Sequence, residues 1–244
     1  MATPESGTEH PSTQPARDCE PLLLLSGSGL QPWIWEEFIS ELPEGTPVTV
    51  AKRPSGDDAS LATYVEHTIA AAPAERFTIV AHSLGAIVGL AVASAVPDRV
   101  TALVAVAGVV PDPPGSFLSA MPIPNRWVLS IAMRIAGTRP PDKAIRKSLT
   151  RGLDSAVADR IVDQFEPDSF QVFRSKISRT DQPQRRGYVT TSNDSELPPK
   201  LQQRFVNALA PEWTSSINTG HLPMLENPSG LAAAILDFVR RPTP

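Results

Sequence analysis

One stretch of the sequence, FTIVAHSLGAIVGL at 77–90, constrains the fold more than any other. Its first five residues are apolar or β-branched, which is typical of a strand that is buried on both faces of a parallel sheet. The residues from Leu84 onward are small and apolar, and they predict a helix that packs against that sheet. A buried strand, a sharp turn and a packed helix in succession indicate an α/β architecture.

The turn itself, Ala81-His82-Ser83-Leu84-Gly85, is a variant of the G-x-S-x-G nucleophile elbow. Residues two before and two after the serine must be small in such a turn, and alanine and glycine occupy these positions. The turn lifts the Ser83 hydroxyl above the strand end and directs helix amides towards it, where they can stabilise an oxyanion. The simpler interpretation is a buried strand and helix that happen to carry a serine.

Strands and helices alternate along the rest of the chain. We expect strands at 20–25, 46–51, 77–81, 100–107, 187–191 and 213–217. We expect helices near 32–38, 59–73, 84–96, 198–209 and 227–240. This alternation predicts an α/β fold with a mostly parallel, doubly wound sheet of about six strands. Reactive groups in such sheets lie beyond the carboxyl ends of the strands.

The pattern changes between 111 and 186, where only helical segments are predicted, near 125–136, 154–165 and 169–177. The first of these has one apolar face, formed by Trp127, Val128, Ile131, Ala132 and Ile135. We therefore assign 20–110 and 187–244 to one α/β core, and 111–186 to a helical lid inserted between two strands. Residues 1–19 are rich in Pro, Ser, Thr and Glu, lack the apolar middle of a signal peptide, and predict a disordered tail.

Composition argues against several classes of function. The 244-residue chain is 41% hydrophobic, which suffices for a core, and its longest apolar runs are far too short to cross a bilayer. A net charge of −4 without a cluster of Lys and Arg argues against nucleic-acid binding. The single Cys19 and four scattered histidines give no disulfide and no metal-ligand spacing. We expect no cofactor, no metal, no membrane or nucleic-acid partner, and a cytoplasmic monomer or homodimer.

Nucleophilic catalysis by a serine needs a base that takes the hydroxyl proton and an acid that orients the base. His221 is the only histidine after Ser83, and it lies between the last predicted strand and the last helix, where a catalytic histidine is expected. The alternative is a surface loop histidine. Asp194 follows the preceding strand directly, and Glu196 is its near rival. His82 cannot be the base, because adjacent residues in such a turn point apart.

Two backbone amides are candidates for an oxyanion hole. They are the N–H of Leu84, next to the nucleophile, and the N–H of Ser28 in the glycine-rich loop (residues 26–29) after the first strand. That loop could instead bind a phosphate, although the lysine and the full glycine pattern of a P-loop are missing. The expected pocket residues are Gly27, Leu30, Trp127, Ile131, Leu222 and Met224. No arginine is obviously placed to receive a carboxylate or phosphate, so we expect a neutral, largely apolar substrate with a small alcohol.

The chain resembles the α/β-hydrolase superfamily and, within it, the plant methylesterase and hydroxynitrile lyase family with its bacterial relatives. The segment LLSGSGLQPWIW aligns with that family's LVHGAGHGAWCW, with matches at Leu24, Gly27, Gly29, Trp33 and Trp35. AHSLG resembles its GHSLG, SNDSELP resembles its T-E-D-x-x-(I/L)-P, and GHLPML resembles its D-H-M-P-M-L. The likeness covers about 20–110 and 187–240 and leaves the lid unmatched.

The resemblance implies a serine hydrolase with a Ser83, Asp194 and His221 triad. The lyase branch has a lysine after the catalytic histidine and a threonine in the glycine-rich loop, where this chain has Leu222 and Gly27, so we do not expect a lyase. We expect cleavage of a carboxylic ester of a small, largely apolar molecule through an acyl-enzyme. The alternatives are a thioesterase, lactonase, C–C hydrolase or cofactor-free perhydrolase, or a catalytically slow ligand-binding protein on the same scaffold.

Overall fold

The computed structural model describes residues 20–54, 56, 58–178 and 180–241, so the disordered tail expected at 1–19 lies outside the described residues. Its centre is a six-stranded sheet in the order β2-β1-β3-β4-β5-β6, and every neighbouring pair of strands is parallel. The strands are β1 (Leu22–Leu25), β2 (Val48–Ala51), β3 (Phe77–His82), β4 (Val100–Val106), β5 (Arg185–Thr191) and β6 (Trp213–Ile217). The predicted doubly wound parallel sheet is confirmed.

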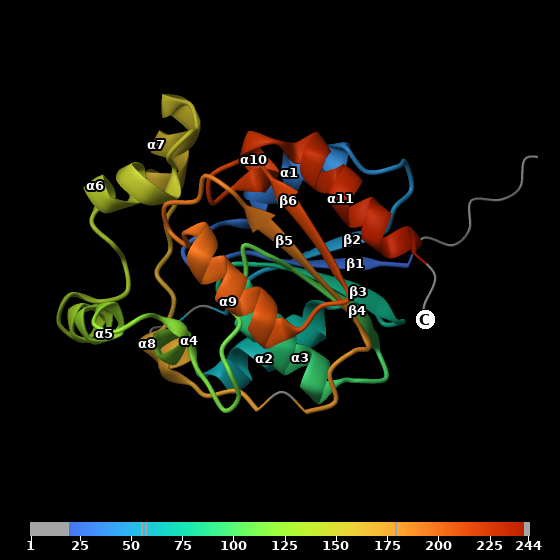
Figure 1. Ribbon diagram of the computed structural model, residues 1–244, viewed down its shortest axis with the longest axis horizontal. Helices are drawn as coiled ribbons and strands as arrows, with labels where there is room; N and C mark the ends of the chain where they lie inside the picture. Colours follow the sequence, from blue (N-terminus) through green and yellow to red (C-terminus); the bar gives the residue numbers. More distant parts are fainter. Residues whose placement is uncertain (1–19, 55, 57, 179, 242–244) are drawn as a thin grey trace, which may run out of the picture.

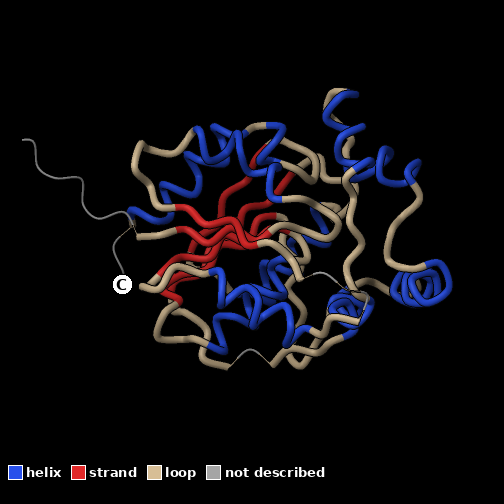
Figure 2. Tube along the Cα trace, turned by 180° about the vertical axis from the view of Figure 1, so that it is seen from behind, coloured by secondary structure: helices blue, strands red, loops and turns tan. Residues whose placement is uncertain are grey.

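Helices cover both faces of this sheet (Figures 1 and 2). One face carries η1 (Pro32–Trp35), α1 (Glu36–Ser40), α10 (Pro223–Glu226) and α11 (Pro228–Arg240). The other face carries α2 (Leu61–Ala71), α3 (Gly85–Ala95) and α9 (Pro199–Leu209). No helix within the described ranges is long and apolar enough to cross a membrane.

The sheet divides the interior into two hydrophobic cores, because successive residues of a strand point to opposite faces. In β1, Leu23 and Leu25 belong to the core under α2, α3 and α9, whereas Leu22 and Leu24 belong to the core under α1 and α11. All four side chains are buried. Burial on both faces explains why the strand is an uninterrupted apolar run rather than an alternating one.

The chain between β4 and β5 forms helices that lie beyond the carboxyl ends of the strands, on the side to which the strand arrows point (Figure 1). They are α4 (Phe117–Ala120), α5 (Asn125–Ala136), α6 (Asp142–Ala144), the π-helix η2 (Ile145–Leu149), α7 (Ser155–Asp163) and α8 (Phe170–Arg174). The range of α5 is the one that periodicity predicts, whereas α4, α6 and η2 are not predicted. We call this segment the lid.

Candidate active site

Ser83 occupies the turn between β3 and α3 in a backbone conformation that residues other than glycine rarely adopt, with φ of 52°. Three hydrogen bonds hold it there. Its N–H donates to the Val106 carbonyl at 3.2 Å, and its own carbonyl accepts from the N–H groups of Ala86 at 3.1 Å and Val109 at 3.0 Å. A strained residue that its neighbours hold so firmly is a feature of functional sites.

Glycines let the glycine-rich loop pack directly against this turn. A Cβ at Gly85 would lie 2.8 Å from the Ser26 carbonyl oxygen, and a Cβ at Gly27 would lie 2.9 Å from the Ser83 Cβ. Both distances are shorter than real Cβ contacts, so neither position accepts a side chain without movement of the backbone. Gly27, predicted as a pocket residue, therefore brings the loop against the serine and is not among the residues that line the cavity.

His221 lies in the loop after β6, and its Nδ1 is 2.7 Å from Oδ2 of Asp194. Both side chains are buried, and His221 lines the same cavity as Ser83. Glu196, the rival acid, contacts the Ser148 hydroxyl of the lid instead. Within the described residues, no hydrogen bond joins Ser83 to His221. The structure thus pairs the predicted acid with the predicted base and places the serine on the same cavity.

The Asp194 carboxylate accepts further hydrogen bonds from the backbone N–H groups of Glu196 and Leu197, both at 2.8 Å, and from the Thr191 hydroxyl at 2.9 Å. Burial raises the pKa of Asp194, but the charge of His221 and the hydrogen bonds from His221, Leu197 and Thr191 outweigh burial and lower it overall. Burial lowers the pKa of His221, but the charge of Asp194 and its hydrogen bond outweigh burial and raise it overall. The pair therefore combines an ionised carboxylate with a histidine that readily takes a proton, as a general base must.

His82 has a supporting position. Its side chain is fully buried, and its Nε2 lies 2.9 Å from the backbone carbonyl oxygen of His221. Burial, followed by the charge of the His221 ring, lowers the pKa of His82 to about 3. The ring is therefore neutral, and its Nε2–H donates to that carbonyl. His82 holds the loop of the candidate base in place and cannot itself receive a proton from Ser83.

The amides of Ser28 and Leu84 are free donors in the described part of the chain. Neither N–H has an acceptor, whereas the amides of the neighbouring Gly29, Leu30 and Ala86 all have one. Ser28 and Ser83 line the same cavity. Unpaired N–H groups beside a nucleophile are what an oxyanion requires in the transition state of acyl transfer.

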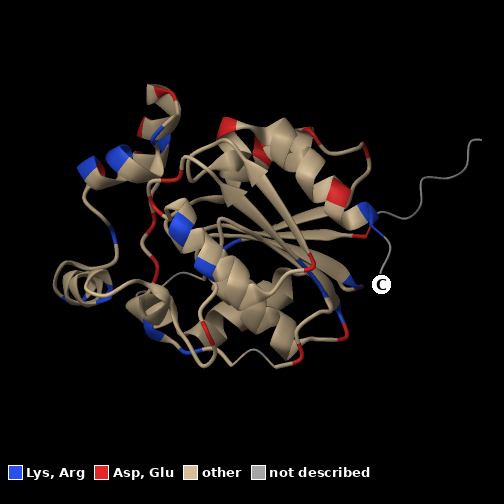
Figure 3. Ribbon diagram, in the orientation of Figure 1, with Lys and Arg blue, Asp and Glu red and all other residues tan. Residues whose placement is uncertain are grey.

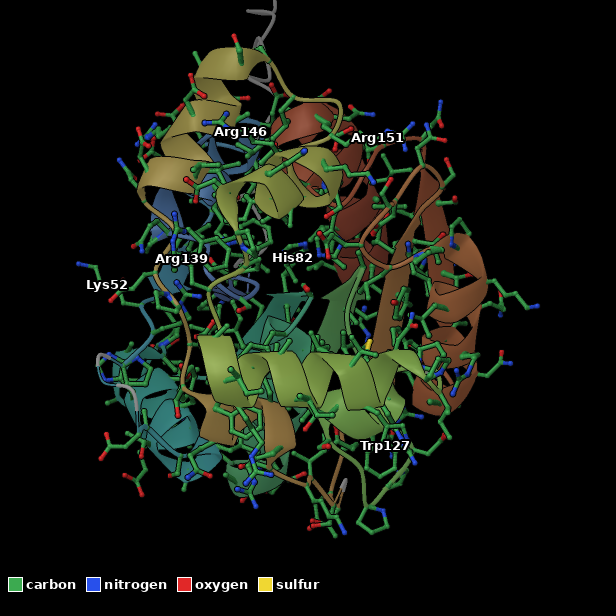
Figure 4. The ribbon with its side chains drawn as sticks, turned by 90° about the vertical axis from the view of Figure 1, so that its left-hand side faces the viewer. Lys52, His82, Trp127, Arg139, Arg146 and Arg151 are labelled. Atoms are coloured by element: carbon green, nitrogen blue, oxygen red, sulfur yellow. The ribbon has the colours of Figure 1, made fainter. Side chains whose placement is uncertain are left out.

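A cavity of about 940 Å³ lies between the lid and the carboxyl ends of the strands. Figure 4 views the molecule from the lid side, with α5 across the front and His82 in the middle, between α5 and the helices α6 and α7 above. The walls of the cavity are largely apolar. They include Leu30, Phe117, Met121, Val128, Leu129, Ala132, Met133, Phe165 and Phe173.

Only one of the six predicted pocket residues, Leu30, lines this cavity. Trp127 and Ile131 are 59% and 56% exposed, because α5 stands away from the body and turns the side with Val128, Leu129, Ala132 and Met133 towards the cavity. Leu222 and Met224 are buried in the hydrophobic core on the side of α1 and α11, and neither lines the cavity. The assignment of these four side chains to the pocket is corrected accordingly.

Two cations line the cavity that the sequence analysis did not place there. Lys200 and Arg204, one turn apart on α9, both belong to its wall. Figure 3 shows the basic positions of this helix in blue. No ion pair involves either of these two cations among the described residues. The expectation that no arginine is placed to receive a carboxylate or phosphate is therefore wrong, because Arg204 lines the cavity. The sequence shows that the two residues lie one helical turn apart, but it does not show that this side of α9 faces the cavity.

No group of three His, Cys, Asp or Glu side chains in the described ranges could hold a metal ion. The site brings together a serine hydroxyl, a buried His–Asp pair and two free amides, which together suit acyl transfer.

Comparisons with known proteins agree with this fold. A family model described as the alpha/beta hydrolase family matches residues 22–234. No curated protein sequence matches the chain. Three similar solved structures are an extracellular alpha/beta-hydrolase from a Paenibacillus species, a methylesterase from Arabidopsis and a pyrethroid hydrolase from Sphingobium faniae. The first is described as sharing structural and functional homology with tobacco salicylic acid binding protein 2.

The three likenesses extend over nearly the whole chain at low identity. The Paenibacillus protein has a TM-score of 0.81 and 17% identity, with 91% of this chain and 100% of that chain covered. The Arabidopsis protein has a TM-score of 0.69 and 14% identity, with 90% of this chain and 98% of that chain covered. The Sphingobium protein has a TM-score of 0.68 and 20% identity, with 91% of this chain and 98% of that chain covered. At such identities the likeness establishes the fold, and function has to be argued from the site.

Proposed function

This chain belongs to the alpha/beta hydrolase family, and on that premise we propose that it hydrolyses a carboxylic ester of a small, largely apolar molecule, with Ser83 as the nucleophile. One observation carries the proposal. His221, joined to the buried Asp194 at 2.7 Å, lines the same cavity as a serine held in a strained turn. A histidine oriented by a carboxylate beside such a serine is the arrangement that activates a hydroxyl for attack.

In this mechanism His221 accepts the hydroxyl proton of Ser83 while the serine oxygen attacks the ester carbonyl carbon. Asp194 stabilises the imidazolium that results. The N–H groups of Ser28 and Leu84 hold the oxyanion. His221 then gives its proton to the departing alcohol and leaves an acyl-enzyme on the serine. Water attacks this ester with His221 again as base, and the carboxylic acid is released.

The cavity supports the proposed substrate class. Its walls are mainly apolar, and its volume of about 940 Å³ exceeds what a small ester alone would fill. An acyl or aryl group can therefore be buried beside the lid while the ester carbonyl reaches the serine. A methylesterase and a pyrethroid hydrolase among the similar structures support hydrolytic chemistry by analogy of fold alone.

Replacing Ser83 by alanine tests the proposal. With p-nitrophenyl acetate and butyrate, we expect kcat/KM to fall by about 10⁴-fold or more, because no acyl-enzyme can form. Alanine fits the small turn, so the circular dichroism spectrum should be unchanged. Retained activity in the variant contradicts the mechanism. Wild-type protein that binds these esters without a burst or turnover favours the alternative of a ligand-binding protein on this scaffold.

A further inference from the structure

The loop that carries the Ser28 amide is held by a segment of the lid. Gly29 donates its N–H to Oδ2 of Asp168 at 3.1 Å, and its carbonyl accepts from the Glu166 N–H at 3.1 Å. Asp168 lies between α7 and α8, 139 residues further along the chain than Gly29. The ring of Phe165 lies against Gly29, where a Cβ would approach it to 2.0 Å. The lid therefore covers the cavity and also contacts the glycine-rich loop directly.

Arg53, which follows β2, contacts the same loop. Its Nη1 donates to the Gly27 carbonyl at 3.2 Å and to Oδ2 of Asp168 at 2.9 Å. The Tyr64 hydroxyl donates to the other oxygen, Oδ1, at 2.7 Å. The side chains of Arg53 and Asp168 are only 16% and 1% exposed. Both carboxylate oxygens of Asp168 thus accept hydrogen bonds. Both members of this buried ion pair also bind the backbone of the glycine-rich loop, Arg53 at Gly27 and Asp168 at Gly29.

The bond to Gly27 has a geometric consequence for Ser28. The Gly27 carbonyl and the Ser28 N–H belong to one trans peptide, and in a planar trans peptide these two groups point in opposite directions. A guanidinium that holds the carbonyl on one side therefore directs the N–H to the other. Ser28 and Ser83 line one cavity, and this N–H has no acceptor among the described residues, so it is available to an oxyanion that forms there.

The bond also has an electrostatic consequence. A cation hydrogen-bonded to a carbonyl polarises the whole amide, so that its N–H becomes a stronger donor. The Leu30 N–H also donates to the Gly27 carbonyl, at 3.3 Å, but this donor is neutral and polarises the peptide less than the Arg53 cation does. A buried ion pair is seldom retained for stability alone, since its desolvation offsets much of the attraction.

We propose that Arg53 and Asp168 are positioning residues for the oxyanion hole. Arg53 orients and polarises the peptide that donates from Ser28, and Asp168 holds both Arg53 and Gly29 from the lid. A residue of the lid is therefore part of the framework that holds the oxyanion hole. The inference rests on the proposed function, because it assigns a role in stabilising the oxyanion formed by Ser83.

The test is the Arg53→Met variant, which keeps the length of the side chain and removes its charge and donors. Lys52→Met is the matched control, because it removes the same charge one residue earlier, from a side chain that points outward at the edge of the molecule (Figure 4). Four quantities are measured for each variant and the wild type. They are kcat and KM with p-nitrophenyl butyrate, and the dissociation constants of a trifluoromethyl ketone and of the methyl ketone with the same carbon chain.

For Arg53→Met we expect kcat to fall by about 10- to 100-fold, somewhat less than the loss of a whole oxyanion-hole donor, with KM nearly unchanged. The trifluoromethyl ketone, whose hemiketal with Ser83 carries the oxyanion, should lose affinity by a similar factor. The methyl ketone, which only fills the pocket, should bind as before. Asp168→Asn should give the same pattern, Arg53→Lys should lie between wild type and Arg53→Met, and Lys52→Met should match the wild type.

Two outcomes overturn the inference in an active enzyme. The first is an unchanged kcat in Arg53→Met. The second is an equal loss of affinity for both ketones together with a raised KM, because this pattern indicates a disturbed pocket. If circular dichroism shows that Arg53→Met is unfolded, Arg53→Lys decides by the same criteria. A wild-type protein without turnover is distinguishable from these results, since it overturns the proposed function and this inference together.

Discussion

Replacing Gln202 by leucine should destabilise the protein far more than the same change one residue later. Gln202 is fully buried on α9, and its side-chain amide closes the loop that carries Asp194. Its Oε1 accepts from the Thr191 N–H at 2.9 Å, and its Nε2 donates to the Leu197 carbonyl at 2.7 Å. The same nitrogen lies 3.3 Å from Oδ2 of Asp194. Leucine has a similar size and can replace none of these bonds.

The size of the effect follows from the groups that would lose their partners. The Thr191 N–H and the Leu197 carbonyl would both remain buried without a hydrogen bond, and each such group costs about 1–3 kcal/mol. We therefore expect the free energy of unfolding to fall by about 4 kcal/mol. For a chain of this length, that corresponds to a fall in Tm of roughly 8–16 °C.

Urea denaturation and thermal melting of both variants measure this difference. The control is Gln203→Leu, because Gln203 is exposed on the same helix and its amide reaches Asn207 at the surface at 3.1 Å. We expect the control to change the free energy of unfolding by less than about 0.5 kcal/mol. Equal stabilities of the two variants would refute the reasoning, since they would show that the buried amide contributes nothing to the loop of the candidate acid.

Further predictions concern the acid, the base and the cavity. Asp194→Asn should lower kcat/KM about 10⁴-fold, because His221 loses the partner of its charged form, while Glu196→Gln should have little effect; the reverse ranking would identify the other carboxylate as the acid. Since His221 must be neutral to take a proton and its pKa is raised, kcat/KM should fall with decreasing pH through a midpoint above the ordinary 6.5, and a midpoint below that value would contradict the assignment. From acetyl to butyryl to octanoyl esters, kcat/KM should rise, because each methylene that the cavity accepts stabilises the transition state by up to about 0.8 kcal/mol. A preference for sugar-like esters would argue against this pocket. Because Lys200 and Arg204 have no ion-pair partner among the described residues, a monomethyl ester of a long dicarboxylic acid should be cleaved faster than its dimethyl ester, and the double charge reversal K200E/R204E should abolish this difference. The same ratio of the two rates in the wild type and in the variant would count against an anion at this wall.

Much of the fold could be predicted from the sequence, because its signals are local. The apolar runs at β1 and β3 indicate strands that are buried on both faces, and the structure has them there. The periodicity of 125–136 predicts α5 with its observed bounds. The pairing of Asp194 with His221 also follows from local order, since both residues follow neighbouring parallel strands whose carboxyl ends meet at one edge of the sheet.

The interior of the site could not be predicted, because it depends on how the lid is placed. An apolar helical face normally indicates the side that is buried, but α5 stands away from the body and leaves Trp127, Ile131 and Ile135 exposed. Of the predicted face only Val128 and Ala132 line the cavity, and Leu129 and Met133 beside them complete that wall. Asp168 gave no signal at all, since an isolated acid in the lid shows nothing of its contact with a loop 139 residues away.

The central claim is that Ser83 carries the acyl group during turnover. Acid quenching of the protein within the first turnovers of p-nitrophenyl butyrate, followed by proteolysis and mass spectrometry, tests this claim directly. We predict a butyryl adduct on the peptide that contains Ser83 in the wild type, more of it in Asp194→Asn if deacylation becomes the slower step, and none in Ser83→Ala. Continued turnover with the acyl group on another residue, or with no acyl-enzyme and an active Ser83→Ala, would contradict it.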